Sequence, residues 1–127
     1  MSLYETPMTR WYWSQVGGLP IKEFMVVPRG PNQARRLVDG LIVLGEEARI
    51  ADQRTFDIAG RDVIAVQSKN RRLGMPLMGQ CLFSRDLVRR LGPKSVRSVA
   101  VCTQDDEILR PLLESHEGCE VVVYPGE

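Results

Sequence analysis

Three side chains in this sequence have the types and spacing of a small hydrolytic site. Asp39 interrupts the apolar run of residues 37–44, whereas Gln67 and Lys69 follow the apolar run of residues 63–66. Because alternate residues of a strand point to the same face, Gln67 and Lys69 should project together. If the two runs form neighbouring strands, Asp39 reaches the same patch. A carboxylate, an amide and an ammonium group would then meet at the end of a buried sheet.

This combination of groups suits a hard divalent cation such as Mg²⁺ or Mn²⁺, which prefers oxygen ligands. Asp39 would supply a carboxylate, Gln67 its side-chain oxygen and Ser68 its backbone carbonyl. Lys69 would orient a metal-bound water or stabilise negative charge on a phosphate. The alternative is structural. In that case Asp39 caps a turn with Gly40, and the two later residues are ordinary polar ends of a strand.

The order of these residues resembles that of the PD-(D/E)XK nuclease superfamily over roughly residues 10–100. In that superfamily an acidic residue on one strand precedes an (E/D/Q)-x-K tripeptide on a later strand, and a helix follows. Here the counterparts are Asp39, the tripeptide of residues 67–69, and a helical stretch from Met75. Val38 stands where a proline is usual, and Gln67 replaces the commoner acid, which leaves one negative charge fewer for a metal. The resemblance implies a metal-dependent DNA endonuclease.

Two further residues are candidates for the site, the first of them from the resemblance. An N-terminal helix of the superfamily often adds a glutamate to the metal site, and Glu23 is the best positional match. Its alternative role is that of a surface residue beside Lys22. Gln80 lies one turn into the helix that follows the tripeptide, where it either faces the site or is satisfied locally.

Positive charge is concentrated near the proposed site, although the whole chain carries a net charge of only +1. Residues 67–97 contain eight basic residues and one acid, Asp86. A basic segment beside a metal site favours a polyanionic partner, here DNA. The alternative is a solvated helix face. The arginines expected to hold the phosphate backbone are Arg71, Arg72, Arg85 and Arg89.

The hydrophobic pattern predicts an α/β fold with a mixed central sheet flanked by helices. The expected order is that of the αβββαβ restriction-endonuclease-like core, followed by an α–β extension with a parallel strand pair. Residues 48–58 are expected to form either an edge strand or an irregular excursion. Helices are predicted at residues 9–24, 75–91 and 105–115, and strands at 35–44, 63–69, 96–102 and 120–124.

Composition sets the broader limits. With 127 residues, 43% hydrophobic and 26% charged, the chain should form a single domain over residues 1–127. We expect a cytoplasmic protein, because no apolar stretch is long enough to span a membrane and the first residues do not resemble a signal peptide. The aromatic cluster of residues 11–13 belongs either to the core or to a homodimer contact.

The sequence lacks the sets of residues that catalysis by histidine or cysteine needs. His116 is the only histidine, and the three widely spaced cysteines lie in apolar segments typical of buried thiols. The main alternative to a nuclease is therefore a catalytically inactive nuclease-like domain that acts as a nucleic-acid-binding or oligomeric scaffold. The neutral Gln67 and the small size of the chain favour that alternative.

Overall fold

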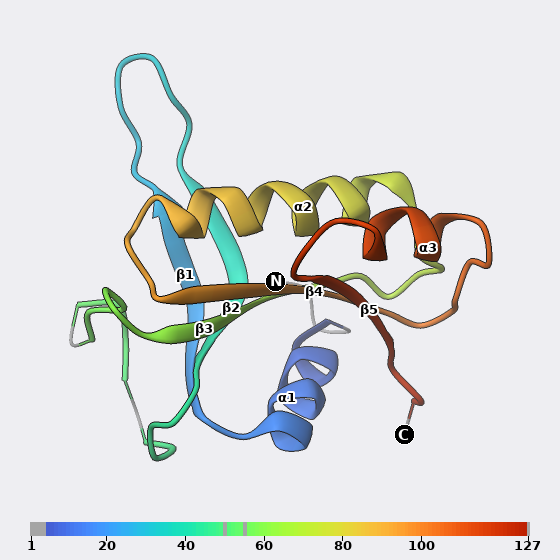
Figure 1. Cartoon of the computed structure of the whole chain (residues 1–127), viewed down its shortest axis with the longest axis horizontal. Coiled ribbons are helices and arrows are strands. Elements are labelled where there is room, and N and C mark those ends of the chain that lie inside the picture. Colours follow the sequence, from blue (N-terminus) through green and yellow to red (C-terminus); the bar gives the residue numbers. More distant parts are fainter. Residues whose placement is uncertain (1–4, 50, 55, 127) are drawn as a thin grey trace.

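The computed structural model describes residues 5–49, 51–54 and 56–126, which form one α/β domain with a five-stranded mixed sheet and three helices (Figure 1). The strands lie in the order β1-β2-β3-β4-β5; the first three are antiparallel, and β3, β4 and β5 are parallel. The predicted α/β class and the parallel pair at the C-terminus are confirmed. The elements are α1 (Glu5–Val16), β1 (Leu19–Val27), β2 (Arg36–Val43), β3 (Asp62–Ser68), α2 (Met75–Arg89), β4 (Ser95–Cys102), α3 (Leu109–Glu114) and β5 (Cys119–Val123).

Helices cover both faces of the sheet. In Figure 1, α1 lies on one face, and α2 and α3 lie on the other. Met8 and Tyr12 of α1 pack against alternate residues of the central strands, including Ile64 and Val66. The opposite residues of β3, such as Ala65, belong to the core on the other side. Burial on both faces explains why β3 and β4 each contain an unbroken apolar run, at residues 63–66 and 99–102.

The N-terminal helix is shorter than predicted, and the strand after it was missed. Helix α1 ends at Val16 because Gly17 and Gly18 both adopt positive φ, at 73° and 87°. Pro20 then falls within β1, not within a helix. The prediction that Glu23 belongs to an N-terminal helix is therefore wrong, since Glu23 lies in β1.

The described part of residues 48–58 is irregular, and no strand forms there; residues 50 and 55 lie outside the described part of the chain. Gln53 from this segment bonds to the outer edge of β1. Its Oε1 accepts from the Met25 N–H at 2.7 Å, and its Nε2 donates to the Met25 carbonyl at 2.6 Å. Three strands still precede α2, because β1 takes the place of a strand at residues 48–58.

The last helix is also shorter than predicted. Asp106 Oδ1 accepts from the backbone N–H of Leu109 at 2.8 Å, so the first regular turn begins only there. Two side chains of α3 bond to the outer edge of β5. Glu114 Oε2 accepts from the Val121 N–H at 3.0 Å, and Arg110 Nη2 donates to the Val121 carbonyl at 3.2 Å.

None of the helices in the described residues has the length and apolar character needed to cross a lipid bilayer.

Candidate active site

The site forms where β2 and β3 stop pairing through their backbones. The ladder between them runs from Val43↔Val63 to Gly40↔Val66. Beyond it, Asp39 Oδ2 accepts a hydrogen bond from the Ser68 N–H at 2.8 Å, and the Asp39 N–H donates to Gln67 Oε1 at 3.4 Å. Side-chain hydrogen bonds thus take the place of the next backbone hydrogen bonds between β2 and β3. The Asp39 carboxylate therefore lies at the C-terminal end of β3, and α/β folds usually bind ligands at this end of their parallel strands.

Gln67 connects three elements through its side-chain amide. Its oxygen accepts from Asp39 on β2, and its Nε2 donates to Ser84 Oγ on α2 at 2.9 Å. Gln67 is only 6% exposed, and Ser84 is buried as well. An amide oxygen has two lone pairs, so the bond from Asp39 leaves Gln67 Oε1 with capacity for one further partner.

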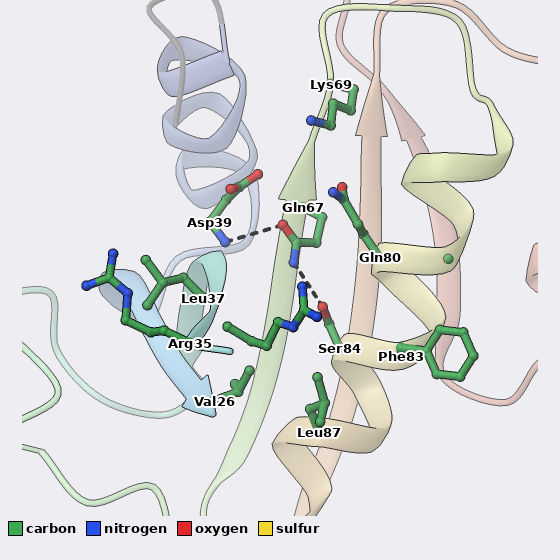
Figure 2. Close-up of a pocket in the computed structure, with 12 residues that line it drawn as sticks. Val26, Arg35, Leu37, Asp39, Gln67, Lys69, Gln80, Phe83, Ser84 and Leu87 are labelled. Atoms are coloured by element: carbon green, nitrogen blue, oxygen red, sulfur yellow. Dashed lines mark hydrogen bonds between the residues drawn. The ribbon is translucent and has the colours of Figure 1, made fainter. Parts of the chain in front are cut away.

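These residues open onto a cavity of about 440 Å³ between the β2–β3 junction and α2. In Figure 2, the side chains of Asp39, Gln67 and Gln80 converge on the space beside Lys69. These four residues form the polar end of the cavity. Phe83 points away from this cluster in Figure 2. The apolar wall at the other end is formed by Val26, Leu37 and Leu87.

The structure therefore brings together four predicted site residues that are up to 41 positions apart in the sequence: Asp39, Gln67, Lys69 and Gln80. Ser68 contributes its N–H to Asp39, and its Oγ lies 2.7 Å from Thr9 Oγ1 of α1. The hydroxyl of Ser68 thus belongs to the contact with α1, on the other face of the sheet.

Glu23 does not line the cavity. It falls between the paired residues Lys22↔Gly40 and Phe24↔Val38, so its backbone lies across from Asp39. The pairing is interrupted there because Glu23 has a φ of 50°, in the left-handed region that non-glycine residues rarely adopt. Glu23 is therefore close to Asp39 along the sheet while its exposed side chain stays outside the cavity wall.

The four arginines expected to bind phosphates fall into two groups. Arg71 and Arg72 line a hollow of about 330 Å³ that shares Lys69 with the main cavity. Arg85 and Arg89 instead form ion pairs with Asp86, at 3.0 and 3.7 Å. Arg85 also donates to the Glu117 carbonyl at 2.7 Å, which ties it to the C-terminal half of the sheet. Only the first pair adjoins the site.

Three polar residues of the cavity lining were missed from the sequence: Arg35, Arg36 and Ser84. The arginine pair could have been found, because residues 24–38 contain three arginines and no acid. Ser84 lies four residues after Gln80 and therefore on the same face of α2. That spacing becomes informative only after the direction of the helix across the sheet is known.

The oxygens at the polar end suit a hard divalent cation, because carboxylate and amide oxygens are its usual protein ligands. Among the residues that the structure describes, no three Asp, Glu, His or Cys side chains form a metal-binding group. Protein ligands for Mg²⁺ would thus be few, and water would complete the shell, as is common for Mg²⁺. The donor set therefore fits a weakly held Mg²⁺ or Mn²⁺.

Comparison of the chain with protein-family models, with curated proteins and with solved structures gave no match, so the assignment of function depends on the site itself.

Proposed function

We propose that this protein is a metal-dependent phosphodiesterase that cleaves DNA, with a restriction-endonuclease-like core of the PD-(D/E)XK type. The observation that carries the proposal is the meeting of Asp39, Gln67 and Lys69 in one cavity at the carboxyl end of β3. The element order αβββαβ, extended by α3 and β5, is consistent with such a core.

Asp39 and Gln67 offer the oxygens that would hold Mg²⁺ or Mn²⁺. When bound, such an ion lowers the pKa of a coordinated water and offsets charge on a phosphate. The bond from the Ser68 N–H fixes the orientation of the Asp39 carboxylate, so little reorganisation is needed on binding. Gln67 is held in turn by Ser84 of α2.

Lys69 supplies the positive charge of the site. It borders both the main cavity and the hollow lined by Arg71 and Arg72. A phosphodiester placed between the two spaces would have the Lys69 ammonium group beside its non-bridging oxygens, where it stabilises the charge that develops during hydrolysis. The two arginines would hold the neighbouring phosphates, which adds affinity and little sequence preference.

A catalytically inactive scaffold is the second candidate, and one observation favours it. Both ends of the Gln67 amide already have protein partners, as expected of a residue that simply joins β2, β3 and α2. In that case the domain would bind nucleic acid through its arginines and would have no affinity for Mg²⁺.

Metal binding and cleavage together separate the two candidates. We expect Mn²⁺ titrated into the wild-type protein to release or absorb heat in a calorimeter, and supercoiled plasmid to be nicked in Mg²⁺ but not in a chelator. Asp39→Asn should remove both effects, because the amide oxygen can still accept from the Ser68 N–H while the negative charge is lost. Absence of any heat from the wild type, together with an intact plasmid, would reject the nuclease in favour of the scaffold.

Lysine variants provide the matched control. Lys69→Ala should reduce cleavage by about 10²-fold or more, which is typical for the loss of one group that stabilises a transition state. Lys94→Ala removes the same charge just before β4, at the opposite end of the parallel pair, and should leave cleavage unchanged. Equal effects of the two changes would mean that Lys69 acts only through overall charge.

A further inference from the structure

The connection between β1 and β2, together with the first two residues of β2, forms an exposed arm, defined here as residues 28–37. Figure 1 shows this hairpin rising from the sheet and extending past α2. Every residue of the arm is exposed except Gly30, which is half-buried. With three residues between the Val27↔Arg36 pair and the turn on each side, the arm reaches about 10 Å beyond that pair.

The arm is a two-stranded ribbon held together by its own hydrogen bonds. Gly30 and Gln33 exchange two backbone hydrogen bonds, of 3.2 and 3.4 Å, around a tight turn at residues 31–32. The Gln33 side chain donates to the Pro28 carbonyl at 2.9 Å and braces the same turn from outside. A preformed ribbon loses little conformational entropy when it binds a partner.

The arm carries only positive charge. Arg29, Arg35 and Arg36 are its charged residues, and no acid occurs between positions 24 and 38. Within the described part of the chain, none of the three forms an ion pair. Seven of the eleven arginines in other parts of the molecule are paired with carboxylates, namely Arg49, Arg54, Arg61, Arg85, Arg89, Arg97 and Arg110.

The base of the arm borders the candidate active site. Arg35, Arg36 and Leu37 line the cavity that contains Asp39 and Gln67. In Figure 2, Arg35 lies across the cavity from α2. A polyanion held by the arm would therefore pass directly over the cavity.

We infer that the arm lies in the major groove of duplex DNA while the cavity faces the adjacent phosphate backbone. The inference rests on the proposed function for the identity of the polymer. A two-stranded ribbon fits the undistorted major groove of B-form DNA, which is about 12 Å wide and about 8.5 Å deep, whereas it enters the minor groove, about 6 Å wide, only when the duplex is deformed. It also does not fit the deep, narrow major groove of duplex RNA. The substrate is thus double-stranded DNA.

Binding measured in a chelator tests this inference without cleavage. Fluorescence anisotropy with a 20-base-pair DNA duplex should give at least tenfold tighter binding than the same sequence as an RNA duplex. Replacing residues 29–34 with Asn-Gly shortens each leg of the arm by two residues, keeps the Val27↔Arg36 pair and supplies a favoured two-residue turn. We expect this short-arm variant to lose at least tenfold in affinity for duplex DNA and less than twofold for single-stranded DNA.

The arginines are tested separately, in case the short arm perturbs folding. Arg29→Ala with Arg35→Ala should reduce the slope of log affinity against log salt by up to about 2, one unit for each lost phosphate contact. The matched control is Arg10→Ala with Arg90→Ala, which removes the same charge from exposed positions on α1 and at the end of α2. This control should leave the slope unchanged.

The outcomes distinguish this inference from the proposed function. Cleavage that requires Asp39, combined with equal duplex affinity for the wild type and both arm variants, overturns the role of the arm and keeps the nuclease. Arm-dependent duplex binding without cleavage supports the arm and rejects the nuclease. Equal affinity of the wild type for DNA and RNA duplexes overturns the inference.

Discussion

Gln67 decides how the site is held together and how strongly it can bind a metal. A neutral amide satisfies both Asp39 and Ser84 without adding charge to a nearly buried position. A carboxylate at this position would strengthen metal binding, but it would stand beside Asp39 in a place with little water. Gln67 therefore favours stability of the metal-free protein over affinity for a cation.

We expect Gln67→Glu to lower the free energy of unfolding at pH 7 by about 1–3 kcal/mol without metal, because of desolvation and repulsion by Asp39. Both effects raise the pKa of the new carboxyl in the folded state. The loss is therefore complete above the raised pKa of the folded state, shrinks as the pH falls through that pKa, and disappears below the pKa of the unfolded state, near 4.3.

Urea unfolding of this variant at pH 7 and pH 4, with and without Mn²⁺, checks both effects. Mn²⁺ should restore stability to Gln67→Glu more than it stabilises the wild type. Gln15→Glu adds the same charge on the exposed surface of α1 and should respond to neither pH nor metal. Unchanged stability of Gln67→Glu in all four conditions would contradict a metal-binding role for this position.

Much of the candidate site could be predicted at the level of single residues, because strand geometry is strongly local. The i, i+2 rule aligned Gln67 with Lys69, and antiparallel pairing of adjacent apolar runs brought Asp39 to them. Partners on α2 could not be predicted in the same way. Ser84 meets Gln67 only because of the position of the helix across the sheet, which is a property of tertiary packing.

At the level of elements, the junction between α1 and β1 fixes where the sheet begins. The sequence signals at residues 17–20 were read as an interrupted helix, although Leu19 and Ile21 already follow the period of a strand. Long apolar strands and the helix after Pro76 were predicted well because they bury continuous faces. β1 was missed although it has nine residues, because the glycines and the proline at its start resemble interruptions of a helix.

Gly17 and Gly18 should respond differently to alanine, although both have positive φ. A Cβ at Gly17 meets no atom within 4 Å, so Gly17→Ala should cost about 1 kcal/mol for the left-handed backbone alone. A Cβ at Gly18 would lie 2.7 Å from the Val43 carbonyl oxygen, so Gly18→Ala should cost about 3 kcal/mol. Chemical unfolding of the pair provides the measurement. Equal losses would mean that β2 shifts freely away from this turn.

At the level of the whole molecule, the face covered by α2 and α3 contains all three thiols. Cys81, Cys102 and Cys119 belong to one core cluster with residues of both helices. Burial raises the pKa of Cys81 to about 12, and it raises the pKa of the other two thiols as well. The thiolate is the reactive form, so a buried thiol with a raised pKa reacts slowly. The reactivity of the three thiols therefore measures whether the helices stay packed on the sheet.

We expect no rapid reaction of the native protein with an aromatic disulfide reagent at pH 8, and three reactive thiols after unfolding in guanidinium. The absorbance of the released aromatic thiol gives the number of cysteines that have reacted. Reaction of one thiol in the native protein, at a rate independent of global unfolding, would instead show that α3 opens locally. Cys119→Ser would then identify whether the contact between α2 and β5 is the part that opens.

The side chains bonded to Met25 and Val121 have a consequence for how molecules of this protein can meet. An uncovered edge strand offers free N–H and carbonyl groups that can recruit a strand from another chain, which leads to aggregation or to a continuous intermolecular sheet. Here Gln53 occupies the edge of β1 near its C-terminal end, at Met25, and Arg110 with Glu114 occupies the middle of β5, at Val121. A strand added at either margin would have to displace these side-chain bonds, so growth of the sheet by strand addition is disfavoured at both edges.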